Sequence, residues 1–188
     1  MTALPYGSPA HHSFITNVGL ITSTGPHGEN VMAAEWTHHI SYEPGMIAVC
    51  LGPNKATAEN ILATAEFGVS IASTDQNVIA SIAGSKHGKE YDKVAALKEL
   101  GYQFLPGATI KPPTVEGARL RAECRLIDHR TYGDHIMFVG EVQRAETDES
   151  KDPAAYHKGK YWHVGENIPK PPQEEMERIK AVVERYRK

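Results

Sequence analysis

The sequence predicts a mainly β (α+β) protein, a barrel of six or seven mostly antiparallel strands with helices inserted between them. Short apolar or alternating segments, separated by turn residues, give this strand count. Neither a GxGxxG nor a GxxxxGK[ST] motif occurs, so we expect neither a doubly wound sheet nor a separate nicotinamide-binding domain. The length of 188 residues, 40% of them hydrophobic, favours one domain with a sizeable core.

The first half of the chain predicts a hairpin, a buried strand and a helix, joined by turns rich in Gly and Pro. Alternating or apolar character marks the strands, and an apolar face marks the helix. The expected elements are a strand over residues 14–23, a turn at residues 25–28, a strand over residues 31–37, a turn at Pro44-Gly45, a strand over residues 46–51 and a helix over residues 56–65.

The second half predicts more strands, with three further helices. The segment at residues 118–130 alternates between apolar and charged side chains, so one face is buried and the other is wet. The expected elements are strands over residues 66–72, 118–130, 136–145 and 156–164, helices over residues 77–83, 91–100 and 174–187, and a loop over residues 102–116. The last helix carries an apolar stripe that needs a cover, from its own barrel or from a second subunit.

Composition argues against several classes of partner. The net charge of −3 gives no basic excess for nucleic acid. No run approaches the ~20 apolar residues of a membrane span, and residues 1–12 lack the features of a signal peptide. Residues 1–10 are expected to form an extended arm.

The two cysteines and the ten histidines do not suggest a metal site. Cys50 and Cys124 lie inside apolar or mixed strands without a partner at metal-binding spacing, so we interpret both as reduced and structural in a cytosolic protein. The histidine pairs are adjacent in sequence, and adjacent strand residues point to opposite faces. No metal ligands are therefore predicted.

One stretch suggests a binding site as well as a scaffold. Ala33 and Ala34 place small side chains in the middle of a strand, which leaves the backbone reachable by a flat ring. Asn54, Lys55 and Thr57 lie at the start of a helix, where free N–H groups attract anions. This combination fits a flavin mononucleotide (FMN). From these residues alone, a helix capped by Asn54 and close packing at the alanines is the simpler interpretation.

Two further features have both a functional and a structural interpretation. The loop at residues 84–89 is small and cationic, so Lys86 and Lys89 are candidates to complete a phosphate clamp with Lys55. Alternatively, Gly84 ends the preceding helix and the loop is solvated. His135 follows Asp134 in a turn, and a histidine bonded to that carboxylate is the simpler interpretation.

The order and spacing of the motifs resemble the flavin reductase-like family of FMN-binding split β-barrels, of the flavoredoxin type. The resemblance spans roughly residues 14–166. The matching segments are Asn30-Val-Met-Ala-Ala-Glu-Trp36, Pro44-Gly45, Thr57 with Asn60-Ile61, Glu66-Phe-Gly-Val-Ser70, Gly133-Asp-His135, Phe138-Val-Gly-Glu-Val142, Tyr156-His157, Gly159-Lys-Tyr-Trp162 and Gly165-Glu166.

This resemblance implies a Greek-key split barrel in which residues 1–188 form a single FMN-binding domain, with an N-terminal arm (1–12) and a C-terminal helix (169–188). It also implies a cytoplasmic homodimer that takes electrons from NAD(P)H and passes them through FMN to an acceptor. The alternatives are a non-enzymatic FMN electron carrier or storage protein, and a related barrel that binds haem or a pyridoxal-type phosphate.

The resemblance also implies roles for individual residues. His135 would face the open side of the flavin, where it orients nicotinamide or acceptor or supplies a proton, and Tyr161 and Trp162 would border the site or the dimer interface. Ser85 and Lys86 are the expected loop contacts. The full set of expected cofactor-binding residues is Asn30, Met32, Ala33, Ala34, Glu35, Trp36, Leu51, Gly52, Asn54, Lys55, Thr57, Asn60, Ser85 and Lys86.

Overall fold

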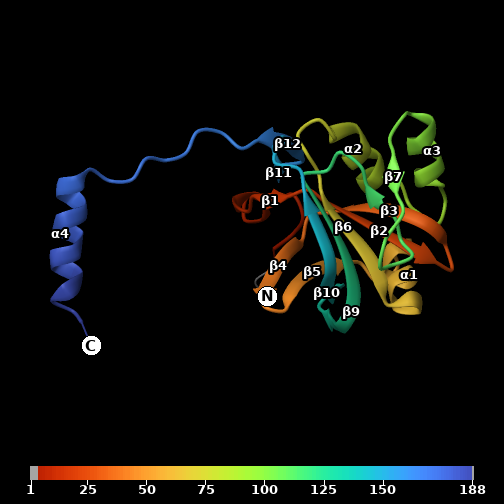
Figure 1. The fold of residues 1–188 in the computed structure, drawn as a ribbon, viewed down its shortest axis with the longest axis horizontal. Helices are drawn as coiled ribbons and strands as arrows, with labels where there is room; N and C mark the ends of the chain where they lie inside the picture. Colours follow the sequence, from red (N-terminus) through yellow and green to blue (C-terminus); the bar gives the residue numbers. More distant parts are fainter. Residues whose placement is uncertain (1–3, 188) are drawn as a thin grey trace.

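A computed structural model describes residues 4–187 (Figure 1). Its elements, in chain order, are a 3₁₀ turn η1 (His11–Ser13), β1 (Thr16–Asn17), β2 (Gly19–Gly25), β3 (Gly28–Ala34), β4 (Thr37–Tyr42), β5 (Gly45–Leu51), α1 (Ala56–Thr64), β6 (Glu66–Ile71), α2 (Asn77–Ser85), α3 (Lys93–Glu99), β7 (Phe104–Leu105), β8 (Thr114–Val115), β9 (Leu120–Tyr132), β10 (His135–Thr147), β11 (Ala154–His157), β12 (Lys160–His163) and α4 (Gln173–Glu184).

The main feature is a seven-stranded antiparallel sheet with the order β3-β2-β6-β9-β10-β5-β4. Its two edge strands, β3 and β4, follow each other in the chain. A small sheet of order β1-β11-β12 and the short pair β7-β8 complete the strands of the described chain. The predicted class, mainly antiparallel β with inserted helices, is confirmed.

The core lies on the inner face of this sheet and beneath α1. Alternate residues of β9, such as Ala122 and Cys124, point into it, as the alternation of that segment predicts. Ile61 of α1 and Phe67 of β6 are fully buried in the same cluster. Phe67 lies directly over Gly140 of β10, where an added Cβ would come within 2.4 Å of the ring.

A second apolar cluster lies on the opposite face of β2 and β3, where α2 and α3 pack. Leu20 and Val31 from the strands meet Ile79 of α2 and Leu97 of α3. Strand β3 therefore presents one face to the main core and the other to α2 and α3. This double packing fixes the position of its C-terminal end, where the candidate site lies.

Several predicted boundaries are wrong, each because a tertiary contact decides it. The strand expected over residues 14–23 is divided at Val18, because β1 pairs with β11 while β2 pairs with β3 and β6. The strand expected over residues 156–164 is the hairpin β11–β12, turned by Lys158 and Gly159 in left-handed conformations. Strand β4 is a separate element that local sequence patterns do not predict.

Two smaller corrections bear on the site. Helix α2 continues through Gly84 to Ser85, so Gly84 does not end it. The expected loop over residues 102–116 contains the short strands β7 and β8, which pair with each other.

Helix α4 stands clear of the sheet at the end of an extended linker (Figure 1). None of its residues is buried. The apolar stripe predicted for this helix is exposed and consists of Met176, Ile179, Val182, Val183 and Tyr186. Among the described residues, no helix has the length and apolar character required to cross a membrane.

Candidate functional site

A small pocket with a cationic lining lies where α1, β3 and the loop between α2 and α3 meet. We call it the cationic pocket; its volume is about 20 Å³. Three lysines face it, and its described lining contains no carboxylate. The lining residues are Asn30, Met32, Lys55, Ala56, Thr57, Ala83, Gly84, Lys86, His87, Gly88 and Lys93.

The first turn of α1 contributes Lys55, Ala56 and Thr57 to the lining of this pocket. Lys55 occupies the N-cap position, and its side chain accepts no hydrogen bond from the helix. The alternative in which Asn54 caps the helix is therefore wrong. An uncapped first turn keeps free donors and the positive end of the helix dipole available to an anion.

Asn30 and Thr57 join β3 to this first turn. The Asn30 Nδ2 group donates to Thr57 Oγ1 over 2.7 Å, and both residues are buried. Asn60, one turn further along α1, makes different bonds, because its Nδ2 donates to Ser23 Oγ and Gly28 O while its Oδ1 accepts from the His27 N–H. Asn60 therefore fixes the β2–β3 hairpin and does not line the pocket.

Lys93 is the most unusual group in the cationic pocket. Only 3% of the residue is exposed, and Nζ donates a single hydrogen bond, to Ala83 O at 3.1 Å. Burial, with a further contribution from the charge of Lys55, lowers the pKa of Lys93 to about 8. Among the described residues, the lysines that form ion pairs are Lys89, Lys98 and Lys151, so Lys93 has no counter-charge there.

The outer wall of the pocket is a loop that approaches β3 closely. An added Cβ at Gly88 would lie 2.4 Å from Asn30 Oδ1, so only glycine fits there without movement. Lys89 does not join the predicted clamp, because it pairs with Glu59 of α1, which also contacts the His27 ring. The hydrogen bond from Lys89, and to a smaller extent the one from His27, lowers the pKa of Glu59. The Glu59 carboxylate is therefore ionised at neutral pH.

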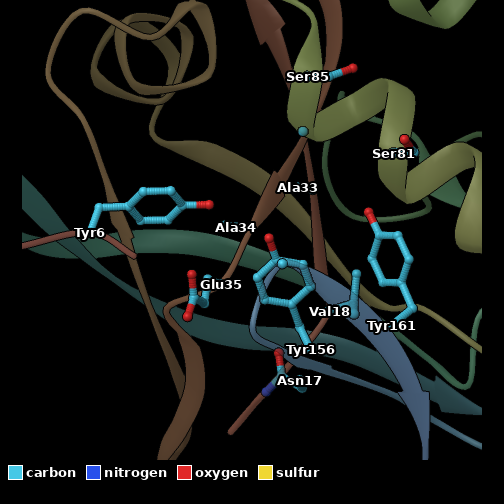
Figure 2. Close-up of a pocket in the computed structure, with 12 residues that line it drawn as sticks. Tyr6, Asn17, Val18, Ala33, Ala34, Glu35, Ser81, Ser85, Tyr156 and Tyr161 are labelled. Atoms are coloured by element: carbon cyan, nitrogen blue, oxygen red, sulfur yellow. The ribbon is translucent and has the colours of Figure 1, made fainter. Parts of the chain in front are cut away.

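A larger pocket adjoins the first across Gly84, which lines both. We call it the tyrosine pocket; its volume is about 390 Å³, within the range of small-molecule sites. Figure 2 shows the N-terminal arm, the end of β3, the end of α2 and the β11–β12 hairpin contributing side chains around it. Its lining residues are Tyr6, Asn17, Val18, Ala33, Ala34, Glu35, Ser81, Gly84, Ser85, Tyr156, Gly159 and Tyr161.

The small side chains of β3 leave this pocket open. An added Cβ at Gly84 would lie 3.4 Å from the Ala33 Cβ, so the strand and α2 are in contact here and larger residues would fill the space. Glu35, at the end of β3, lies 3.3 Å from His11 Nε2, which joins the N-terminal arm to the rim of the pocket.

Tyr156 and Tyr161 of this pocket have raised pKa values. Burial raises the pKa of Tyr156 to about 12, with a hydrogen bond to Tyr6 as the second cause. Burial also raises the pKa of Tyr161, whose ring centroid lies 5.6 Å from that of Tyr156. Near neutral pH both hydroxyls are therefore available as hydrogen-bond donors.

Trp36 and His135 form an aromatic pair outside both pockets. Their ring centroids are 4.5 Å apart and the rings are inclined by 47°. His135 Nδ1 lies 2.7 Å from Asp134 Oδ1, and this hydrogen bond lowers the pKa of Asp134. The histidine bonded to the turn carboxylate is thus present, as the simpler interpretation of the sequence predicts. The pair brings together the β3–β4 connection and the β9–β10 hairpin.

The predicted cofactor-binding residues are distributed over these regions, and their roles stay predictions. Those lining the cationic pocket are Asn30, Met32, Lys55, Thr57 and Lys86. Those lining the tyrosine pocket are Ala33, Ala34, Glu35 and Ser85. Those lining neither pocket are Trp36, which pairs with His135, and Leu51, Gly52, Asn54 and Asn60.

The lining residues that sequence reasoning missed include Lys93, Tyr6 and Tyr156. Lys93 carries a signal, because it shares a helix face with the apolar Leu97 four residues later and has no acidic partner on that face. Tyr6 carries none, since it lies in an irregular arm. Tyr156 belongs to a segment predicted to be one strand, and the hairpin that directs it into the pocket is not part of that prediction.

This chain is similar to flavin reductases and to a flavoredoxin. A family model of the flavin reductase like domain matches residues 11–165. An uncharacterised protein of Pyrococcus abyssi (strain GE5 / Orsay) is 36% identical over 118 residues, which are 62% of this chain and 66% of that protein.

Characterised relatives are more distant. The FMN reductase (NADH) SmoA of Agrobacterium fabrum is 25% identical over 149 residues, 79% of each chain. Other similar proteins are named as NADH-dependent reductases of FMN or of FAD. Among solved structures, the flavoredoxin of Desulfovibrio vulgaris (Miyazaki F) superimposes with a TM-score of 0.75 at 26% identity, covering 90% of this chain and 97% of that chain.

Proposed function

The chain belongs to the flavin reductase-like family, and from this premise we propose that it binds FMN and uses it to pass electrons from NAD(P)H to an acceptor. The observation that carries the proposal is the pair of adjoining pockets, one cationic and one broad and aromatic, that share Gly84. A phosphate ester attached to a flat ring system has the same division of properties.

The cationic pocket fits the phosphate of FMN. It offers the uncapped first turn of α1 and three lysines without carboxylates. Lys55 and Lys86 are exposed, so they can swing outward to enlarge the present volume of about 20 Å³ when an anion enters. The buried Lys93 gains a counter-charge at the same time, which supports an anionic ligand here.

The tyrosine pocket fits the ring. Ala33 and Ala34 line it without bulky side chains, and the Tyr156 and Tyr161 hydroxyls offer hydrogen bonds to polar atoms of the ring edge. When bound, the flavin supplies the hydride chemistry. The chain itself holds the phosphate, exposes one ring face and places donors where negative charge accumulates.

Neither GxGxxG nor GxxxxGK[ST] occurs in this sequence to indicate a separate nicotinamide-binding domain, so we propose that the nicotinamide donor enters the flavin site directly. Trp36 and His135 are the residues proposed to receive it, since both rings are accessible and belong to the two strand connections beside the site. His135 is held by Asp134, which fixes the ring and leaves Nε2 for a substrate.

Two finer features belong to the same proposal. We propose a homodimer, supported by exposed apolar side chains along the edge strand β4, Ile40 and Tyr42, and by the uncovered stripe of α4. We also propose a cytoplasmic location, supported by the two unpaired cysteines, Cys50 and Cys124.

The test begins with the colour of the pure protein and titrations with FMN and with FAD. We expect a visible flavin band, saturable FMN binding and a dimer by light scattering. Under anaerobic conditions, NADH or NADPH is expected to bleach the band rapidly. A protein that binds no flavin contradicts the proposal. A yellow protein that neither nucleotide bleaches is instead a non-enzymatic electron carrier or a flavin-storage protein.

A further inference from the structure

We propose that Lys93 is a buried anchor for the terminal phosphate, which makes the site select a flavin with a doubly charged phosphomonoester and couples its binding to proton uptake. The inference rests on the proposed flavin site and names the feature of the ligand that the site recognises. Neither the family match nor the names of the relatives assign a role to this residue.

The ammonium group of Lys93 lies at the wall of the cationic pocket. Lys93 begins α3, and its Nζ donates to the O atom of Ala83 in α2; both residues line the pocket. An ammonium has three N–H donors, and this one uses a single donor on a carbonyl. The other two have no acceptor among the described residues, although the side chain is nearly completely buried.

The groups around the Lys93 ammonium leave its charge unbalanced. From α1 it faces Lys55, and from the loop after α2 it faces Lys86 and His87. Strand β3 offers only the neutral Asn30. The residue before Lys93, Asp92, is the N-cap of α3, and its carboxylate accepts a hydrogen bond from the Ala95 N–H. No described group neutralises Lys93, so an entering anion supplies the missing charge.

The charge on the phosphate distinguishes one flavin from another. A phosphomonoester carries nearly two negative charges above its second pKa of about 6, whereas each phosphate of a dinucleotide is a diester with one charge. Gly88 lies against Asn30 in the wall of the pocket, and the next residue, Lys89, is held by Glu59 of α1. The geometry therefore favours FMN over FAD, and riboflavin lacks the recognised group altogether.

FMN binding is coupled to the protonation of Lys93. In the free protein, the pKa of Lys93 is about 8, because burial and Lys55 disfavour its charge. A bound dianion raises that pKa, since an opposite charge favours the ammonium. FMN binding must then take up a proton above pH 8, so its dissociation constant is expected to rise about tenfold between pH 7 and pH 9. Riboflavin binding is expected to stay constant over this range.

The experiment measures dissociation constants of FMN, FAD and riboflavin at pH 7, 8 and 9 for the wild type and for Lys93→Met. In the variant we expect FMN to bind about 10- to 100-fold more weakly at pH 7, with riboflavin within about twofold and the alkaline weakening absent. Lys93→Arg keeps the charge and does not titrate in this range, so its FMN binding is expected to be independent of pH.

The control is Lys98→Met, on the exposed side of the same helix, where Lys98 pairs with Glu29. We expect it to leave the FMN-to-riboflavin affinity ratio unchanged. An unchanged ratio in Lys93→Met, or a pH dependence that persists in Lys93→Met or Lys93→Arg, overturns the inference while leaving the proposed flavin site intact. If Lys93→Met does not fold, as judged by circular dichroism, the pH profile of Lys93→Arg decides. A wild type that binds none of the three flavins contradicts the proposed function itself.

Discussion

The cationic pocket and the Trp36–His135 pair differ in how completely this chain builds them. The pocket is walled by β3, α1, α2 and α3, and its central lysine is 3% exposed. The aromatic pair lies at two strand connections, and Trp36 is 47% exposed. The region proposed to bind the cofactor is therefore enclosed by this chain, whereas the face proposed for chemistry stays open to a second ring.

The enclosed region also has a cost that the open one lacks. A buried cation without a partner destabilises the folded chain until a ligand neutralises it. An exposed aromatic pair carries no such penalty, since water covers whatever the ligand does not. Substitutions in the cationic pocket are therefore expected to change ligand affinity and stability together, and substitutions at the pair to change turnover alone.

The largest expected effect tests whether the pocket must be closed. In Gly88→Val the new side chain collides with Asn30, so the loop moves outward together with Lys86 and His87. We expect FMN affinity to fall at least about 100-fold, the scale of two charge-assisted hydrogen bonds, with a much smaller loss for riboflavin. Titration by flavin fluorescence measures both.

The matched control for that change is Gly165→Ala, because an added Cβ there meets no neighbouring atom within 4 Å. Equal losses of FMN and riboflavin in Gly88→Val would show that the loop supports the whole site and not the phosphate end.

The second prediction concerns stability without ligand. Lys93→Met removes a buried charge, so the FMN-free variant is expected to be more stable than the wild type by about 1–3 kcal/mol at pH 7. The pKa of Lys93 is about 8 in the folded chain, below the ordinary lysine value of 10.5, so the unfolded chain holds more protons between these values. Wild-type stability therefore rises with pH across this window, and the advantage of Lys93→Met shrinks.

Urea denaturation of FMN-free protein at pH 7 and pH 9 measures this difference, with Lys98→Met again as the control. A variant less stable than the wild type at both pH values would mean that the ammonium is already satisfied in the folded protein.

The third prediction addresses the open region. In His135→Asn we expect anaerobic flavin reduction by NADH or NADPH to slow about tenfold, below the usual range for a buried acid or base, because solvent reaches this position. FMN affinity is expected to stay within about twofold. Stopped-flow absorbance measures the reduction rate. His129→Asn, on the exposed part of β9 in the same hairpin, serves as the control.

The two regions also differ in what the sequence alone could predict. The start of α1 was predictable, because Gly52, Pro53 and Asn54 end the preceding strand and an apolar helix face follows; the anion site at Lys55 stays a prediction. The alternation in β9 was predictable for the same local reason. Period and turn chemistry are encoded within a few residues, so these parts need no knowledge of the rest of the fold.

Features that depend on distant segments were not predictable. The division between β1 and β2 depends on the pairing of β1 with β11, more than a hundred residues away. The tyrosine pocket likewise depends on distant segments, because Tyr6 and Tyr156 both line it. For Lys93, the shared helix face with Leu97 is a local signal, but its burial depends on the elements packed around it and its proposed role depends on a ligand. Tertiary contacts decide these positions over local propensity.

The smallest predicted effect compares two lysines of one pocket. Lys86 is exposed and rests against the Tyr91 ring at 5.4 Å, so water and salt screen its attraction for a phosphate. We expect Lys86→Met to weaken FMN binding about threefold in 0.1 M salt and hardly at all in 1 M salt, where the Debye length is about 3 Å.

The loss in Lys93→Met is expected to persist at both salt concentrations, because ions cannot enter the buried side of the pocket. Fluorescence titrations of the two variants in parallel make the comparison. If salt abolished both effects equally, Lys93 would act from the surface like Lys86, and burial would no longer distinguish the enclosed region from the open one.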